Sequence, residues 1–383
     1  MTPRKATKKS SRATTRKRAT KSTPRRGVSP AGSVVEQLDA IERAGGDGDV
    51  SLGRGVTLHV SSLDKVYFPD AGVTKGALMR YYAQVAPALL PQLEGRPLVL
   101  KRYPEGVTGE MFFQQDAGPH VPEVVRVQAL DTEEKGKRMR IIGGDLATLL
   151  YTVQLGAIEV HPWLSRVNDI DAADRCLIDL DPDDEVPFSS VVALAGDILR
   201  IVEECGLTAA TKTSGSTGMH VVLPLPPRTS YDTSVRLASR IAELAVRLRP
   251  GVATVERSIH GRPAGSIYVD AMQNARGKSA ASAYSVRARA GATVSAPLEP
   301  CELTGRLRMS AFTTRTMPAR IARMGDIWGS ALSARPAARV LTRALQMLDD
   351  ALDAPAKDDG PPRARKRVRA GGRNAGAGAA RRH

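Results

Sequence analysis

The stretch CLIDLDP (176–182) is an aliphatic run that carries two aspartates and ends at a proline. Such residues favour a buried strand, and Pro182 stops it. Successive strand side chains alternate between faces, so Asp179 and Asp181 are expected to project from the same face. Two carboxylates held this close repel one another unless cations lie between them, and hard divalent cations prefer oxygen ligands. The stretch predicts a metal site, and the simplest alternative is an aspartate-rich turn after a buried strand.

A third aspartate, Asp270, ends another apolar run, in SIYVDAMQN (266–274). A carboxylate at the end of a second strand would complete a site for two metal ions about 4 Å apart, the arrangement that supports in-line phosphoryl transfer. We therefore expect Asp179, Asp181 and Asp270 to converge and to act as catalytic, metal-binding residues.

Between these strands lies a glycine-broken turn, TSGSTGMH (213–220). Gly215 and Gly218 permit backbone conformations that expose N–H groups to a phosphate. The turn also carries hydroxyls and an imidazole, on Ser214, Thr217 and His220. An ordinary hairpin with a core histidine is the alternative. The turn fits neither GxGxxG nor the P-loop pattern, which argues against those nucleotide-binding folds.

Basic residues follow Asp270 in QNARGKSAASAYSVRAR (273–289). Lys278 and Arg287 would neutralise a triphosphate close to a metal ligand, as cationic side chains do in phosphoryl transfer. A solvated charged hairpin is the alternative explanation for the run.

Positive charge is concentrated at the two ends of the chain. The 383 residues have a net charge of +16, but residues 1–26 hold 11 Lys and Arg, residues 361–383 hold 8, and neither segment has an acid. Removing these 19 from 56 basic residues leaves 37 against 40 acidic ones, a net charge of −3. Both ends are poor in large apolar residues, which predicts disordered arms that bind nucleic acid through its charge. A transit peptide is the alternative for the first arm, but the similar far end disfavours it.

Periodicity and capping signals predict an α/β fold in which mixed sheets are flanked by helices, because strands and helices interleave without strict alternation. Helices are expected over 34–44, from the Thr74 cap to 93, from the Asp145 cap to 156, and over 189–205, 233–248 and 338–350. Strands are expected over 56–60, 96–103, 176–181, 219–225, 266–270 and 282–287. The expected organisation is a disordered basic tail (1–33), one domain (34–335), and a C-terminal helix with a second disordered basic tail (336–383).

Other features of the composition exclude whole classes of protein. No apolar run approaches the roughly 20 residues of a membrane-spanning helix, so no membrane association is expected. The three cysteines, Cys176, Cys205 and Cys301, are widely spaced, which indicates neither a zinc knuckle nor a disulfide framework. A reducing cytosol is the expected compartment.

Taken in order, the aspartate pair, the SGxxGxH turn and the strand aspartate followed by QNxRGK and YSVR resemble the archaeo-eukaryotic primase superfamily. Within it, the chain resembles the polymerase domain of bacterial ligase D, which acts in non-homologous end joining. The resemblance runs from about Ser62 to Trp328 and implies a primase-type catalytic core with an N-terminal α/β extension. Further matching blocks are LDKVYFP (63–69), GVTKG (72–76), RPLVLKRYP (96–104), MFFQQDA (111–117), GAIEVHPW (156–163) and FTTRTMPARIARMGD (312–326).

The resemblance implies a role for each matching residue. The three aspartates would hold two ions, manganese or magnesium. The nucleotide triphosphate, ribo or deoxy, would be bound by His161, Ser214, Gly215, Thr217, His220, Lys278 and Arg287. Many relatives have lysine at the position of Thr217, so one contact to the triphosphate is expected to differ here.

Other matching residues imply contacts with DNA. Lys65 and Lys75 match lysines that bind the 5′-phosphate at a gap or break, whereas without the resemblance they are ordinary surface lysines. Phe113, with Phe112 beside it, matches an aromatic that stacks on a template base, the alternative being core packing. Arg262 is expected near the primer terminus.

The implied activity is template-directed nucleotide addition at gaps and broken ends of DNA, in the bacterial cytoplasm at the nucleoid. KDDG (357–360) matches the KxDG pattern of ligases, but only 23 residues follow it, so we expect no ligase domain and a separate ATP-dependent DNA ligase as partner. A Ku-type end-binding protein is the second expected partner. The alternatives are a primase that starts strands de novo and a DNA-compacting protein with an inactive core.

Overall fold

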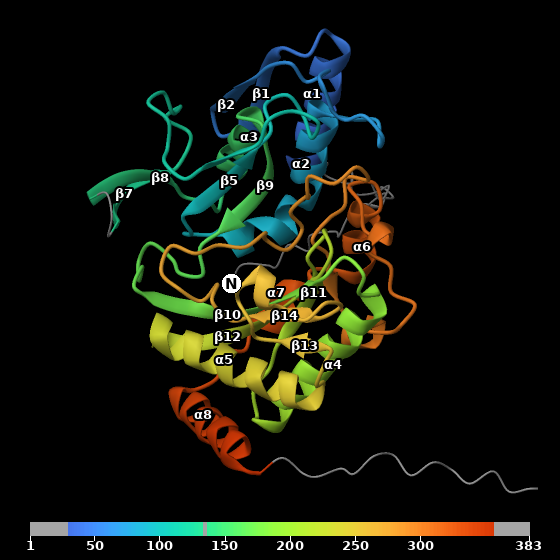
Figure 1. Ribbon diagram of the computed structural model, residues 1–383. Coiled ribbons are helices and arrows are strands. Elements are labelled where there is room, and N and C mark those ends of the chain that lie inside the picture. Colours follow the sequence, from blue (N-terminus) through green and yellow to red (C-terminus); the bar gives the residue numbers. More distant parts are fainter. Residues whose placement is uncertain (1–29, 133–135, 356–383) are drawn as a thin grey trace, which may run out of the picture.

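The computed structural model describes residues 30–132 and 136–355 (Figure 1). Nearly all of the predicted N-terminal tail, the C-terminal tail and the KDDG segment lie outside these ranges, so the predictions made for them stay open. The first helix, α1 (Pro30–Arg43), begins four residues earlier than expected. No helix in the described part of the chain is long and apolar enough to cross a membrane.

A six-stranded mixed sheet forms the centre of the molecule. Its strand order is β13 (Ala253–Thr254), β14 (Ile267–Asp270), β10 (Ala172–Pro182), β12 (Met219–Ser230), β11 (Ala210–Thr213) and β15 (Pro297–Leu298). All neighbours are antiparallel except β13 and β14, which are parallel. The α/β fold with mixed sheets is therefore confirmed.

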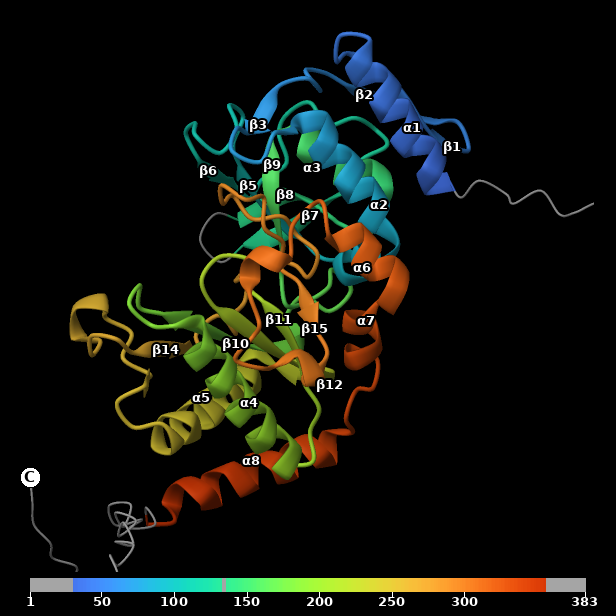
Figure 2. The same ribbon diagram turned by 90° about the vertical axis from the view of Figure 1, so that its right-hand side faces the viewer.

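Helices α4 (Phe188–Glu204), α5 (Tyr231–Leu248) and α8 (Ala338–Asp353) lie on one side of this sheet, with α8 outermost against α5 (Figures 1 and 2). The residues of β10 that face α5 include Cys176, whose thiol donates to the Ser234 carbonyl oxygen. Because strand side chains alternate, Asp179 and Asp181 face away from these helices. The acidic face of β10 is thus turned toward the N-terminal half of the molecule.

The N-terminal half covers that opposite face. It contains the antiparallel sheet β6 (Phe112–Gln114), β5 (Leu98–Arg102) and β9 (Ala157–Pro162), backed by α2 (Lys75–Leu93) and α3 (Leu146–Gln154). Smaller hairpins are β1 (Gly48–Gly53) with β2 (Val56–Val60), β3 (Val66–Phe68) with β4 (Val73–Thr74), and β7 (Val127–Thr132) with β8 (Gly136–Ile141). Helices α6 (Met317–Met324) and α7 (Ile327–Leu332) pack between the halves, against α2.

The local capping predictions were accurate where a side chain closes the helix. Thr74 accepts a hydrogen bond from the backbone N–H of Ala77 at 3.0 Å, and Asp145 accepts one from Thr148 at 2.7 Å, as N-caps do. The helix expected from Ser189 instead begins at Phe188 and has no side-chain cap.

The strand expected over 282–287 is wrong. Tyr284 has a φ of +67°, which interrupts extended backbone, and only one isolated bridge, Val286 to Val294, forms in this segment. The sequence pattern was apolar enough for a strand, but the segment is a loop that crosses between the two halves. There the Tyr81 hydroxyl donates to the Tyr284 carbonyl oxygen at 2.8 Å.

Candidate active site

The three aspartates lie together on one face of the main sheet. Asp179 is directly opposite Asp270 on β14 and, on its other side, directly opposite His220 on β12. Asp181 lies two residues further along β10 and shares the face of Asp179. Since hydrogen-bonded strands are only about 5 Å apart, this register gathers acidic side chains that are far apart in the sequence.

Asp179 is the carboxylate whose ionisation is most changed by this arrangement. Burial raises its pKa, and the negative charges of Asp181 and Asp270 raise it further, to about 7. Lys212 and Arg287 lower it without outweighing these causes. When it is ionised, this carboxylate therefore carries a charge that the cations of the protein compensate only in part.

Protein donors contact the other two carboxylates. Asp181 Oδ2 lies 3.4 Å from Nη1 of Arg262, while Asp270 accepts hydrogen bonds from the Tyr268 hydroxyl at 3.2 Å and the Gln273 amide at 2.9 Å. Within residues 30–132 and 136–355, no three His, Cys, Asp or Glu side chains already enclose a space for a metal ion. The donor set nevertheless fits hard divalent cations, because it offers three carboxylates of which only Asp181 lies at ion-pair distance from an arginine in the described part of the chain. An ion at this position would replace Arg262 as the partner of Asp181.

The glycine turn between β11 and β12 packs closely against β10. Gly215 has a φ of +72°, and a Cβ on Gly218 would lie 1.8 Å from the Leu180 carbonyl oxygen, so a side chain there would separate the turn from the aspartate strand. The Ser214 hydroxyl accepts hydrogen bonds from the N–H groups of Ser216, at 3.1 Å, and Gly218, at 3.0 Å. These two N–H groups are thus used inside the turn, whereas we expected the turn to offer its N–H groups to a phosphate.

A polar pocket of about 270 Å³ opens between the turn and the carboxylates of Asp179 and Asp181, and neither Asp270 nor Gly215 is among its lining residues. Of the predicted residues, the pocket is lined by His161, Asp179, Asp181, Ser214, Thr217, His220 and Arg287. Lys278 is exposed and is not among the lining residues, although its neighbour Ser279 is. The lining also includes Ser216 and Gln273, which were not predicted, and Arg289, which belongs to the basic run expected near the metal ligand Asp270.

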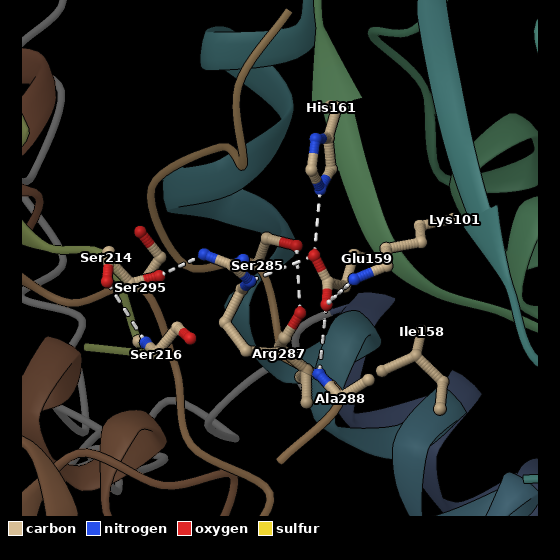
Figure 3. Close-up of polar contacts among 12 residues, drawn as sticks. Lys101, Ile158, Glu159, His161, Ser214, Ser216, Ser285, Arg287, Ala288 and Ser295 are labelled. Carbon is tan, nitrogen blue, oxygen red and sulfur yellow. Dashed lines mark hydrogen bonds and ion pairs between the residues drawn. The ribbon is translucent and has the colours of Figure 1, made fainter. Parts of the chain in front are cut away.

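Glu159, a buried residue that was not predicted, bridges the side chains of His161 and Arg287 (Figure 3). Glu159 on β9 is only 2% exposed, and its Oε2 lies 2.9 Å from both the His161 ring nitrogen Nε2 and Nε of Arg287. Its Oε1 accepts from the Ala288 backbone N–H at 3.1 Å and lies 3.4 Å from Lys101 Nζ. One carboxylate therefore holds two of the predicted nucleotide-binding side chains.

The Glu159 side chain stays ionised although it is buried. Burial by itself would raise its pKa, but the hydrogen bond from His161 and the charge of Arg287 lower it well below its usual range. For His161, burial lowers the pKa and the contact with Glu159 offsets this only in part. A neutral His161 donates from Nε2 to the glutamate, which fixes the tautomer of its ring.

Lys212 is a second unpredicted residue of the site. It lies opposite His220 across the β11–β12 pair, and its Nζ is 2.7 Å from both His220 Nδ1 and the Ser295 hydroxyl. Burial, followed by the charge of Lys212, holds the pKa of His220 well below its usual range. The neutral ring accepts from Lys212 at Nδ1, so Nε2 carries the proton and lies 3.4 Å from Asp179 Oδ1.

The aromatic pair expected to contact a template base lies at the surface. Phe112 is 42% and Phe113 56% exposed, so the alternative of core packing is wrong. The ring of Phe113 meets that of His161 edge to face, with centroids 6.5 Å apart, and Lys101 lies 6.0 Å from its centre. The exposed ring of Phe113 therefore lies against His161, one of the residues that line the polar pocket.

The two lysines expected to bind a 5′-phosphate lie side by side at the start of α2. The backbone N–H of Lys75 donates to the Lys65 carbonyl oxygen at 2.8 Å. Lys65 Nζ pairs with Glu105 at 2.6 Å, whereas Lys75 is 5% exposed and its Nζ donates to the Ser61 carbonyl oxygen at 2.9 Å. Burial and the charge of Lys65 lower the pKa of Lys75 to about 8. Their role toward DNA stays a prediction.

Comparison with known proteins shows which family this chain resembles. The model of the family described as LigD, primase-polymerase domain, matches residues 74–328. The chain is 32% identical over 265 residues to the multifunctional non-homologous end joining protein LigD of Pseudomonas aeruginosa, covering 69% of this chain and 31% of that protein. It is 32% identical over 269 residues to the bifunctional LigD of Bacillus subtilis, covering 70% of this chain and 43% of that protein. The chain thus spans less than half the length of these relatives.

A solved structure agrees with the sequence comparison. The polymerase domain from Mycobacterium tuberculosis ligase D, in complex with DNA, is similar with a TM-score of 0.67 at 29% identity. The similarity covers 73% of this chain and 99% of that one. It therefore extends through nearly all of that polymerase-domain chain.

Proposed function

The chain belongs to the family of LigD primase-polymerase domains, and on this basis we propose that it adds nucleotides to 3′ ends at gaps and breaks in DNA under the direction of a template. Members of this family are metal-dependent nucleotidyltransferases. The single observation in the structure that carries the proposal is the strand register that places Asp270 and His220 on either side of Asp179.

Asp179, Asp181 and Asp270 would hold two divalent ions, manganese or magnesium. When bound, such ions supply a lowered pKa for the primer 3′-hydroxyl and stabilise the charge that develops on the reacting α-phosphate. The protein contributes a rigid strand register that keeps the carboxylates in place before substrate arrives. The raised pKa of Asp179 supports this role, because a divalent cation would compensate the charge that burial disfavours.

The nucleotide triphosphate would lie in the pocket between the glycine turn and Glu159. Arg287 offers a fixed positive charge there, because its Nε is anchored on Glu159 and its Nη1 donates to the Ser214 carbonyl oxygen at 2.5 Å. His161 and Arg287 are oriented by the same carboxylate, so the two side chains would engage the substrate together. The choice between ribo- and deoxyribonucleotides belongs to this proposal.

The DNA would approach from the side of Phe113 and Lys65. The exposed ring of Phe113 next to His161 offers a stacking surface for a template base beside the nucleotide pocket. Lys65 and Lys75 would bind the 5′-phosphate across a gap. Arg262 would leave its contact with Asp181 and contact the primer end instead. End joining with a separate ATP-dependent ligase and a Ku-type protein, in the bacterial cytoplasm at the nucleoid, completes the proposal.

Primer extension on a gapped duplex with a 5′-phosphate tests the proposal directly. The reaction is run with each nucleotide type and with manganese or magnesium. The double variant Asp179→Ala, Asp181→Ala should lose extension while its affinity for DNA changes little. Asp184→Ala is the matched control, since it removes an exposed charge three residues beyond Asp181. Extension by the double variant would refute the site.

The same preparation separates the alternatives. A de novo primase would make dinucleotides from two triphosphates on single-stranded DNA without a primer. A DNA-compacting protein would bind DNA equally well with and without the aspartates and would extend no primer under any metal condition.

A further inference from the structure

Outside the active site, arginines gather at the other end of β10. A pocket of about 200 Å³ is lined there by Arg166, Arg175 and Arg335 together with Asp174 and Asp326. The arginines come from β10 itself, from the segment before it, and from the segment between α7 and α8. The pocket shares none of its lining residues with the catalytic pocket.

One carboxylate is shared by most of these cations. Asp174 Oδ2 lies 2.6 Å from Nη2 of the fully buried Arg96, 3.1 Å from Nε of Arg166 and 3.1 Å from Nη2 of Arg335. Burial would raise the pKa of Asp174, but the charges of Arg96, Arg175 and Arg166 lower it to about 2. A single negative charge is therefore already divided among three guanidinium groups.

Among the described residues, Arg175 makes no such ion pair, although the charge of Asp174 acts on it from beyond ion-pair distance. Its Nη2 donates to the Gln92 side chain at 2.7 Å, and within the described ranges no carboxylate lies at ion-pair distance from it. Burial, followed by the charge of Arg96, lowers its pKa well below the usual range. A guanidinium that is bonded to one amide keeps unused N–H donors, since the group carries five.

The charges around the pocket do not balance. The four arginines Arg96, Arg166, Arg175 and Arg335 face two carboxylates, Asp174 and Asp326, which leaves an excess of two positive charges. Asp326 is one of the two carboxylates, and its Oδ1 accepts from the Tyr284 hydroxyl at 2.7 Å and from the Gly329 N–H at 3.0 Å, neutral donors that leave its charge in place. Partly buried charge of one sign is unfavourable without a counter-ion, and guanidinium groups match the geometry of oxyanions.

We propose that this arginine pocket binds a phosphate-type dianion, either inorganic phosphate or the terminal phosphate of a nucleotide. Arg175 and Arg335 provide the free donors, and the anion neutralises the two excess charges. Bound there, it ties the segment that leads into α8 to β10. Because Arg175 lies four residues before Asp179 on the same face of the strand, roughly 13 Å away along it, the anion site is separate from the catalytic pocket.

Thermal unfolding of the full chain in metal-free buffer tests this site. Increasing phosphate, compared with chloride at equal ionic strength, should raise Tm in a saturable way, because a ligand that binds only the folded state stabilises it. Arg175→Gln and Arg335→Gln should each weaken the apparent phosphate affinity about tenfold. If the partly buried Arg175→Gln fails to fold, Arg335→Gln decides, since that side chain is 40% exposed.

Two control variants locate the effect. Arg343→Gln, on the exposed side of α8, and Arg287→Gln, in the catalytic pocket, should both keep the response to phosphate. The proposal is overturned by a wild-type chain that does not respond, by an undiminished response in Arg335→Gln, or by loss of the response in Arg287→Gln. Competition by a 5′-mononucleotide would identify a terminal phosphate as the ligand, and binding of phosphate alone would restrict the site to the free anion.

Discussion

The two ends of one face of β10 carry opposite uncompensated charge. At Asp179 and Asp181 carboxylates exceed the cations that touch them, and the pKa of Asp179 rises to about 7. Around Arg175, guanidinium groups exceed carboxylates, and the pKa of Asp174 falls to about 2. Both ends are positioned by the same strand, so the difference comes from which side chains the neighbouring elements contribute. At the acidic end, the ionised Asp179 that metal binding requires is expected to lower the stability of the fold. At the basic end, ionised Asp174 is expected to raise it.

The largest expected effect is at the acidic end. Asp179→Asn should lower kcat for primer extension by at least about 10³-fold, because it removes a metal-binding carboxylate. The same variant should be more stable than the wild type in metal-free buffer at pH 8. The folded pKa lies above the unfolded one, so ionised Asp179 disfavours the folded state, and stability declines as pH rises from about 4 to 7.

Activity assays and urea unfolding with and without EDTA measure the two quantities separately. An Asp179→Asn variant that is less stable than the wild type at pH 8 would show that the site is not strained by its own charge.

At the basic end, removing a carboxylate is expected to lower the stability of the fold instead of raising it. Asp174→Asn should destabilise the fold by about 3 kcal/mol, since it leaves three arginines without their shared partner. The folded pKa of Asp174 is lowered to about 2, so its contribution is present above the unfolded pKa of about 4 and is lost as pH falls from there toward 2.

Urea unfolding of the wild type and of Asp174→Asn between pH 3 and pH 7 measures this. The two stability curves should converge at the acid end. Parallel curves would mean that the carboxylate is not the group that compensates the arginines.

A smaller effect is expected at Glu159, between the two halves of the molecule. Glu159→Gln should lower kcat/KM for the nucleotide by about 10²-fold, because His161 and Arg287 lose the carboxylate that orients them. Steady-state kinetics with varied nucleotide, together with the affinity for gapped DNA, separate this from a general loss of binding. Glu110→Gln, an exposed change of the same kind on the same half of the molecule, should be neutral.

The smallest effect is expected at Lys212. Lys212→Met should lower the extension rate about tenfold and raise the pKa of His220, because the charge of Lys212 is one of the causes that hold this pKa down. Nuclear magnetic resonance of the histidine ring reports both its pKa and its tautomer. An unchanged tautomer would show that Nδ1 of His220 does not depend on the lysine.

Several features of the fold and site could be predicted because they are local. Alternation along CLIDLDP sufficed for Asp179 and Asp181 to share a face, and the side-chain caps at Thr74 and Asp145 depend on residues three positions away. Loop 282–287 could not be read in this way, since its apolar pattern suits a strand while the backbone turns at Tyr284. His161 was found only through resemblance to a family, because nothing in its neighbourhood marks it as a ligand.

The sequence by itself determined the aspartate pair, the left-handed Gly215 turn and the unequal distribution of charge along the chain. Tertiary structure alone decided that Glu159 reaches Arg287, that Lys212 meets His220, and which cations surround Asp174. These contacts join residues from different elements, and they depend on strand register and on how the two halves pack. Local periodicity contains no information about either, so the charge balance at each end of β10 could be found only in the folded molecule.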